Sequence, residues 1–185
     1  YHSEVQHNMQ GDEINIIGQY DLTFRLPPVP YEGTYELRIC APQIQHFGMF
    51  QVYLGTDRLN PTPIGLPLDF RIASSNPNIG WEPDVDDVEI NSEIDKRMRN
   101  HGYMKNNKHG GIPAAGSTVT ASLRSASGDY IRLRKILWSG TMKPDEEYFV
   151  RIKSVLNNTR TCCMLDYLEI VPRTVYSGEE VEDPW

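Results

Sequence analysis

The apolar segment at residues 163–172 constrains the fold more than any other feature of the sequence. Successive side chains of a β-strand point to opposite faces, and both alternating sets in this segment are largely apolar. Such a strand is typical of the interior of a layered β-structure. Pro172 ends it, because proline cannot donate a hydrogen bond to a neighbouring strand. The segment therefore predicts one strand that is buried on both faces inside a sandwich.

Asp166 is the exception in this segment. A carboxylate among apolar residues must find a hydrogen-bond partner or lie at the rim of a sheet. We interpret Asp166 as a structural residue bonded to a neighbouring loop, because perturbed carboxylates are often structural. A catalytic role is the alternative.

Alternation of apolar and polar residues predicts further strands. Residues 20–26 and 34–40 both alternate in this way, on either side of a stiff proline-rich connector at residues 27–33. We expect these two strands to form a half-buried antiparallel pair. Other strands are predicted at residues 14–17, 47–54, 64–72 (a sheet edge), 117–123, 130–138 and 148–155.

The middle of the chain, residues 73–116, lacks this alternation and is rich in polar residues, glycine and proline. A connection of this length is usually functional or disordered. Within it, Ile90, Ile94 and Met98 recur every four residues, which predicts a short helix of about 10 to 13 residues. His101-Gly102 supplies the end of that helix.

Many strands, one helix and no alternation of strands with helices indicate an all-β fold, an antiparallel β-sandwich of jelly-roll type. The length of 185 residues suits one large β-domain. We expect that domain at residues 1–176, with the central excursion at 73–116, and a loosely held acidic tail at 177–185. The fold class alone does not assign a function.

Charge and hydropathy argue against several partner classes. The 25 acidic and 18 basic residues give a formal net charge of -7, which disfavours binding to a nucleic-acid backbone. There is no run of 18 apolar residues to predict a transmembrane segment. Tyr1 is followed by no signal-peptide core, so we expect a mature form or an excised domain.

The three cysteines show no metal-binding pattern. Cys40, Cys162 and Cys163 are an odd number without the Cys-x-x-Cys spacing of a zinc site, and they argue equally against a disulfide framework. We expect them to be small buried apolar residues. A bridge from Cys40 to one of the pair is the alternative in an oxidising compartment.

Several runs of the sequence are similar to a known bacterial domain. They are residues 20–30 with 33–38, 51–54 with 65–69, Gly80-Trp81, 95–105 and 164–172, and the run at 95–105 is the most specific. Over residues 18–176 the chain resembles the C-terminal domain of fasciclin-domain surface lipoproteins of gut Bacteroidetes. Nothing in it resembles the fasciclin domain itself.

The resemblance implies a galactose-binding-like jelly roll, similar to carbohydrate-binding modules, in an accessory protein of polysaccharide utilisation. It also implies a place at the bacterial cell surface or outer membrane, anchored by lipid through a segment outside this chain, or in the periplasm. No binding or catalytic residues are carried over from it.

A sugar-binding surface needs flat aromatic rings flanked by side chains that hydrogen-bond hydroxyl groups. The candidate aromatic residues are Trp81, Tyr103 and Trp138. Trp81 and Tyr103 flank the central excursion, and the candidate polar residues Arg97, Arg99 and Asn100 lie near them in the sequence.

A structural role is the competing interpretation of the same residues, and we favour it slightly for the excursion. Trp81 and Tyr103 then pin the excursion to the sandwich, because long loops need packed anchors of their own. Trp138 is expected to pack in the core or at its rim. On this interpretation, Arg97 and Arg99 pair with the acidic residues Asp84, Asp86 and Asp87.

The acidic run from Asp84 to Glu89 offers oxygen ligands of the kind that calcium takes. The EF-hand pattern fails, because no glycine stands at its sixth position. We prefer a helix start, in which Asp86 or Asp87 is stabilised by the helix dipole. A calcium site at Asp84, Asp86 and Asp87 is the alternative, and no other cofactor is expected.

The sequence gives little support for catalysis. It contains none of the common nucleophile, zinc or phosphate-binding motifs. A glycosidase needs only two carboxylates across a cleft, and Asp69 with Asp166 or Glu169 is such a pair. We expect a chain that is not an enzyme.

Two hypotheses follow. The first is a non-catalytic module that binds a polysaccharide or oligosaccharide for a cell-surface assembly. The second is a structural subunit that docks onto other outer-membrane surface proteins and contacts no sugar. Exposed rings at Trp81, Tyr103 and Trp138 would favour the first, and buried rings with an apolar patch elsewhere would favour the second.

Overall fold

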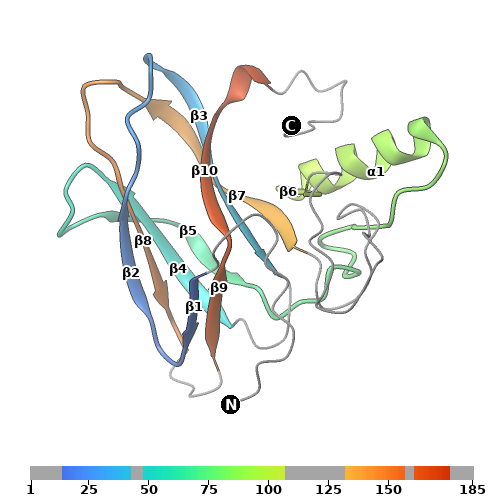
Figure 1. Ribbon diagram of the computed structural model, residues 1–185, viewed down its shortest axis with the longest axis horizontal. Helices are drawn as coiled ribbons and strands as arrows, with labels where there is room; N and C mark the ends of the chain where they lie inside the picture. Colours follow the sequence, from blue (N-terminus) through green and yellow to red (C-terminus); the bar gives the residue numbers. More distant parts are fainter. Residues whose placement is uncertain (1–13, 43–47, 107–131, 157–160, 176–185) are drawn as a thin grey trace, which may run out of the picture.

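A computed structural model shows the fold, and it describes residues 14–42, 48–106, 132–156 and 161–175. The strand predicted at 117–123, the end of the excursion and the acidic tail lie outside these residues. Two four-stranded antiparallel sheets form the body (Figure 1). The first contains, in order, β2 (Asp21–Arg25), β8 (Phe149–Ser154), β4 (Met49–Gly55) and β5 (Thr62–Asp69). The second contains β10 (Tyr167–Pro172), β3 (Gly33–Pro42), β7 (Arg132–Met142) and β6 (Tyr103–Met104).

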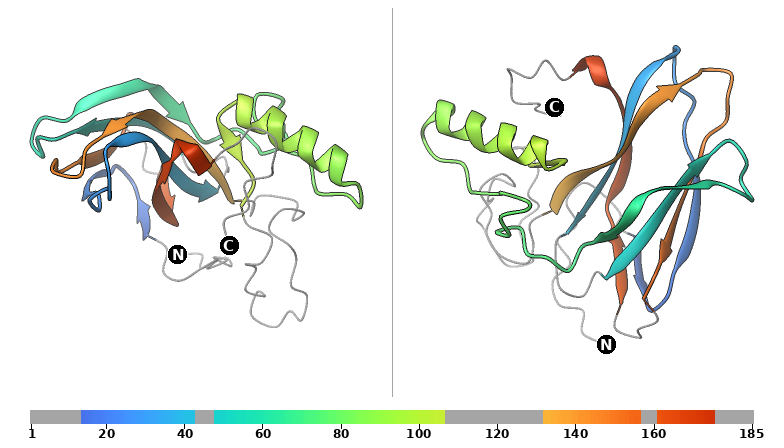
Figure 2. Two further views of the ribbon diagram at one scale, coloured as in Figure 1. Left: turned by 90° about the horizontal axis from the view of Figure 1, so that it is seen from above. Right: turned by 180° about the vertical axis from the view of Figure 1, so that it is seen from behind.

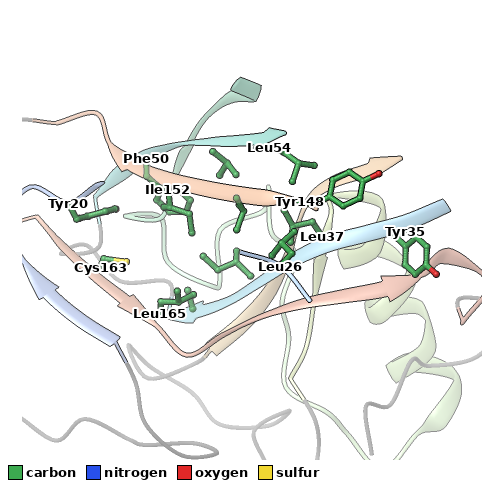
Figure 3. Packing of buried hydrophobic residues seen from close by; sticks show 14 of the residues in the cluster. Tyr20, Leu26, Tyr35, Leu37, Phe50, Leu54, Tyr148, Ile152, Cys163 and Leu165 are labelled. Atoms are coloured by element: carbon green, nitrogen blue, oxygen red, sulfur yellow. The ribbon is translucent and has the colours of Figure 1, made fainter. Parts of the chain in front are cut away.

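The main hydrophobic core lies between the two sheets. Alternate side chains of β3, β4 and β8 point into it, because strand residues alternate between faces. Leu37, Phe50 and Ile152 come from three different strands and are almost fully buried (Figure 3). The antiparallel β-sandwich predicted from the sequence is therefore present, and β5 lies at a sheet edge as expected.

The expected pairing of the two early strands is wrong. β2 pairs with β8, and β3 pairs with β10 and β7, so the two lie in different sheets. The connector between them carries Leu26 and Val29 into the core, where both are buried. Local alternation predicts which face of a strand is buried but not which strand it pairs with. Here the connector crosses from one sheet to the other.

The segment at residues 163–172 is not one strand. It consists of β9 (Cys162–Leu165), which pairs with β1 (Ile14–Ile17), and β10, which pairs with β3. Asp166 lies at the break, where its backbone N–H donates to the Cys40 carbonyl at 3.2 Å. Cys163 and Leu165 face the core before the break and Leu168 after it, so the inward positions change from odd to even. This change explains why both alternating sets are apolar.

The predicted helix is confirmed as α1 (Val88–Asn100). Asp87 caps its first turn by accepting hydrogen bonds from the backbone N–H groups of Glu89 and Ile90. At its end, Gly102 adopts a left-handed conformation with φ of 75°. The chain then returns to the second sheet as β6, so part of the excursion belongs to the sandwich (Figure 2).

The three cysteines are buried thiols that take part in no disulfide, as expected for small apolar residues. None of the helices in the described residues is long and apolar enough to span a membrane.

Candidate functional site

Trp81 and Tyr103 lie in a second apolar cluster, which joins α1 to the second sheet. Only 8% of Trp81 and 7% of Tyr103 are exposed, and both contribute to a cluster that includes Ile94, Met98 and Leu133. The two rings therefore pack as anchors of the excursion, and their faces are not free to stack on a ligand.

The arginines of α1 also hold the excursion in place, but not through the acidic residues predicted. Arg97 donates to Glu82 and, at 3.0 Å, to the Gly80 carbonyl. Arg99 reaches strand β3, where it donates to both oxygens of Glu36 at 2.6 and 2.8 Å. The partner of Arg97 thus lies within the excursion but is not one of the predicted aspartates, whereas the partner of Arg99 comes from a strand outside it. Asn100, the last residue of the helix, is exposed.

A layer of buried charges covers the outer face of the second sheet. Arg38 donates to Glu36 at 2.8 Å and to Glu169 at 3.2 Å, and Arg134 donates to the Lys105 carbonyl at 3.0 Å. All of these residues except Glu169 are almost completely buried. Because each charge has an opposite charge or a carbonyl beside it, the layer functions as a structural attachment for the excursion.

The three carboxylates considered for calcium do not converge. Asp84 accepts a hydrogen bond from the Lys105 ammonium at 2.7 Å, Asp87 caps α1, and Asp86 is exposed. Within the described residues there is no group of three or more His, Cys, Asp and Glu side chains that could hold a metal ion.

Trp138 lies in the middle of β7, where its ring is half-buried against the main core. The ring covers Gly140, because a β-carbon added to that glycine would come within 2.2 Å of it. This position fits the packing role expected for Trp138 at the rim of the core.

The carboxylates considered for a glycosidase belong to different parts of the fold. Asp69 ends β5 in the first sheet and is held by Arg71, with two side-chain hydrogen bonds of 2.8 and 2.6 Å. Glu169 lies on β10 in the second sheet and is held by Arg38. Asp166 lies 3.8 Å from the Cys40 sulfur.

A different surface offers the features that a sugar needs, and we call it the Tyr53 surface. It is the outer face of the first sheet, and adjacent strands place its side chains in rows. One row contains Thr23, Arg151 and Tyr53. The next rows contain Asp21, Lys153 and Gln51 on one side, and Arg25, Phe149 and Gly55 on the other. The rings of Tyr53 and Phe149 are half-buried, and most of the polar side chains around them are exposed.

A bidentate ion pair fixes the polar part of this surface. Arg151 donates two hydrogen bonds of 2.6 Å to Asp21, and its guanidinium carbon lies 5.5 Å from the centre of the Tyr53 ring. The hydrogen bonds lower the pKa of the Asp21 carboxyl below its usual value and raise that of Arg151. Both side chains therefore stay charged at neutral pH.

Gln51 holds the strand on the other side of Tyr53, away from Arg151. Its side-chain amide donates to the carbonyls of Val52 and Ile64 at 2.9 and 3.1 Å. These bonds hold the irregular part of β5 beside Tyr53, at the point where the pairing of β4 with β5 shifts register. The aromatic ring thus stands on a braced part of the sheet, so the surface is preorganised.

Sequence reasoning missed this surface. Alternation within the strand predicted at 47–54 puts Gln51 and Tyr53 on one face, but Asp21 and Arg151 are 130 residues apart in the chain and meet only through the pairing of β2 with β8. The signal available in the sequence was Tyr53, an aromatic residue on the face of the predicted strand opposite to Phe50 and Val52.

Comparison of the chain with protein-family models, with curated proteins and with solved structures found no match.

Proposed function

We propose that this chain is a non-catalytic glycan-binding module that binds polysaccharide or oligosaccharide on the Tyr53 surface. The observation that carries the proposal is the half-buried Tyr53 ring beside the Arg151–Asp21 ion pair on a solvent-facing sheet. An aromatic ring stacks on the apolar face of a sugar ring. Charged groups beside it donate to and accept from the hydroxyl groups.

The topology supports a jelly roll of the galactose-binding-like type as part of this proposal. From β2 to β4, successive strands alternate between the two sheets, and late strands are inserted between early ones. β8 lies between β2 and β4, and β7 lies between β3 and β6. Such interleaving is expected of a jelly roll, which is built from two Greek keys, and it supports this part of the proposal.

The resemblance to the domain of fasciclin-domain lipoproteins supplies the proposed setting. We place the module at the outer surface of a bacterial cell or in its periplasm, as an accessory to polysaccharide utilisation. A lipid anchor on a segment outside this chain would hold it there.

A glycan array tests the proposal with the native chain and a Tyr53→Ala variant, using plant, host and microbial glycans. Tyr31→Ala is the matched control, since Tyr31 is 50% exposed and lies in the connector before β3. We expect the native chain and Tyr31→Ala to bind the same glycans and Tyr53→Ala to lose them. The proposal would be refuted if the folded native chain bound no glycan on the array.

The second candidate function is docking onto other surface proteins without sugar contact. The burial of Trp81 and Tyr103 under α1 favours it, together with apolar side chains that α1 exposes. A chain with this function alone would bind no glycan on the array but would bind a protein partner.

A further inference from the structure

The apolar stripe of α1 continues beyond the body of the sandwich. Ile94 and Met98 are buried in the second apolar cluster, with 4% and 0% exposed. Ile90, one turn earlier on the same stripe, is 47% exposed. Figure 1 shows why: α1 ends beside β6, and its first turns lie farther out, past the edge of the sheet. The sandwich therefore covers only the later part of the stripe.

Two valines enlarge this uncovered region. Val88, in the first turn, is 79% exposed, and Val85 is 47% exposed. The Asn91 side chain holds Val85 against the helix by accepting from its backbone N–H at 2.9 Å and donating to its carbonyl at 2.8 Å. Asn91 is three residues after Val88 and one after Ile90, so it holds Val85 on the side of the helix between them. We call the exposed apolar residues Val85, Val88 and Ile90 the α1 surface.

The rim of the α1 surface is acidic. Asp86, Asp87, Glu89 and Glu93 are all exposed, and the structure gives none of them an ion-pair partner among the residues it describes. The arginines of α1 do not neutralise this rim, because Arg97 pairs with Glu82 and Arg99 with Glu36. Lys96 is exposed three residues after Glu93 and offsets one of these four charges, so the charge around the apolar centre is net negative.

We propose that the α1 surface docks onto a protein that presents an apolar centre ringed by lysine and arginine. Charge complementarity selects this partner, because a basic ring matches the acidic rim and like charges across an interface are unfavourable. The same argument disfavours a second copy of this chain, whose α1 surface would bring its own four carboxylates against these. The proposal rests on the second candidate function and does not depend on sugar binding.

A synthetic amphipathic helix of leucine and lysine is the probe, and the same helix with glutamate in place of lysine is its control. Binding is measured by NMR titration of the full chain, which gives both the affinity and the residues affected. We expect the lysine probe to bind at residues 85–93 and to weaken with added salt, because salt screens exposed charges. The glutamate probe should not bind there.

Two variants locate the interaction. Val88→Ser with Ile90→Ser removes apolar contact area, and we expect it to weaken lysine-probe binding about tenfold or more. Leu59→Ser is the matched control, because Leu59 is 80% exposed but lies in the turn between β4 and β5. That control should bind as the native chain does.

The possible outcomes distinguish failure of the α1 surface as the docking site from failure of protein docking as a function. If the lysine probe binds elsewhere or binds Val88→Ser with Ile90→Ser unchanged, the α1 surface is not the docking site, although protein docking elsewhere survives. If the lysine and glutamate probes bind equally, the basic partner is refuted. Self-association that is lost in the same double variant would identify a second copy as the occupant and would also overturn the proposal.

Discussion

The Glu36 carboxylate on β3 accepts hydrogen bonds from the Arg99 guanidinium at the end of α1, although 63 residues separate them in the chain. Glu36 is 1% exposed, and Arg38 donates to it from the same strand. One buried carboxylate therefore joins the excursion to the sandwich. Both arginines share this carboxylate, so a change at Glu36 affects the excursion and the strand together.

We predict that Glu36→Gln lowers the free energy of unfolding by about 3–5 kcal/mol, because it removes the negative charge from a buried group of ions that includes Arg38 and Arg99. Urea unfolding measures the change. Arg25→Ala is the control: Arg25 pairs with Glu147 at the surface, and an exposed pair contributes only about 0–1 kcal/mol. Equal losses in the two variants would contradict a structural role for the buried charges.

The stripe of α1 gives a second prediction. Met98→Ala should cost about 2–5 kcal/mol, because Met98 is fully buried in the second apolar cluster. Ile90→Ala, on the same stripe, should change stability by only about 0.5 kcal/mol, because the side chain is half-exposed. Thermal or urea unfolding of both variants checks the contrast. A large loss in Ile90→Ala would mean that the start of α1 is already covered.

Alkaline pH should destabilise the fold through its buried tyrosines. Burial raises the pKa of Tyr103 to about 12 and raises the pKa of Tyr20 and Tyr167 as well. In the unfolded chain these hydroxyls lose their protons near pH 10, whereas the folded chain keeps them. The folded state then binds more protons, so stability is complete below about pH 10 and falls as pH rises beyond it.

Each such tyrosine contributes on the order of 1 kcal/mol per pH unit in that window. Urea unfolding of the native chain and of Tyr103→Phe, between neutral pH and pH values above 10, measures the slope. The variant should lose stability less steeply. Lys135 acts in the opposite sense, because burial lowers its pKa to about 8. Its contribution to stability rises with pH between about 8 and the ordinary lysine pKa near 10.4, so it overlaps the loss from the tyrosines only near pH 10. Identical slopes for the two chains would contradict a raised Tyr103 pKa.

Periodicity was sufficient to predict the local elements. Ile90, Ile94 and Met98 predicted α1, and His101-Gly102 predicted its end, because caps and helical spacing are properties of neighbouring residues. The same holds for Asp87 at the start of the helix and for the alternation that gave β3. All of these signals lie within a few residues of the structure they determine.

The associations between distant segments were not predictable in this way. The pairing of β2 with β8, the change of inward positions at Asp166 and the partners of Arg99 all depend on which segments meet in three dimensions. The Tyr53 surface belongs to the same class, because its aromatic ring and its ion pair come from three strands. Trp81 and Tyr103 were chosen for being aromatic, and residue type alone does not distinguish a buried anchor from a ligand platform.

Isothermal titration with an oligosaccharide found on the array tests the central claim, sugar binding at Tyr53, most directly. The native chain is compared with Tyr53→Ala and Tyr31→Ala after circular dichroism has shown that all three fold alike. We expect Tyr53→Ala to weaken binding about tenfold or more. Stacking between aromatic rings contributes about 0.5–1.5 kcal/mol beyond the burial of apolar area, and we expect a sugar stacked on Tyr53 to gain a similar amount in addition to the burial. Tyr31→Ala should keep the native affinity. Unchanged affinity in folded Tyr53→Ala would contradict the account, whatever glycan the chain binds.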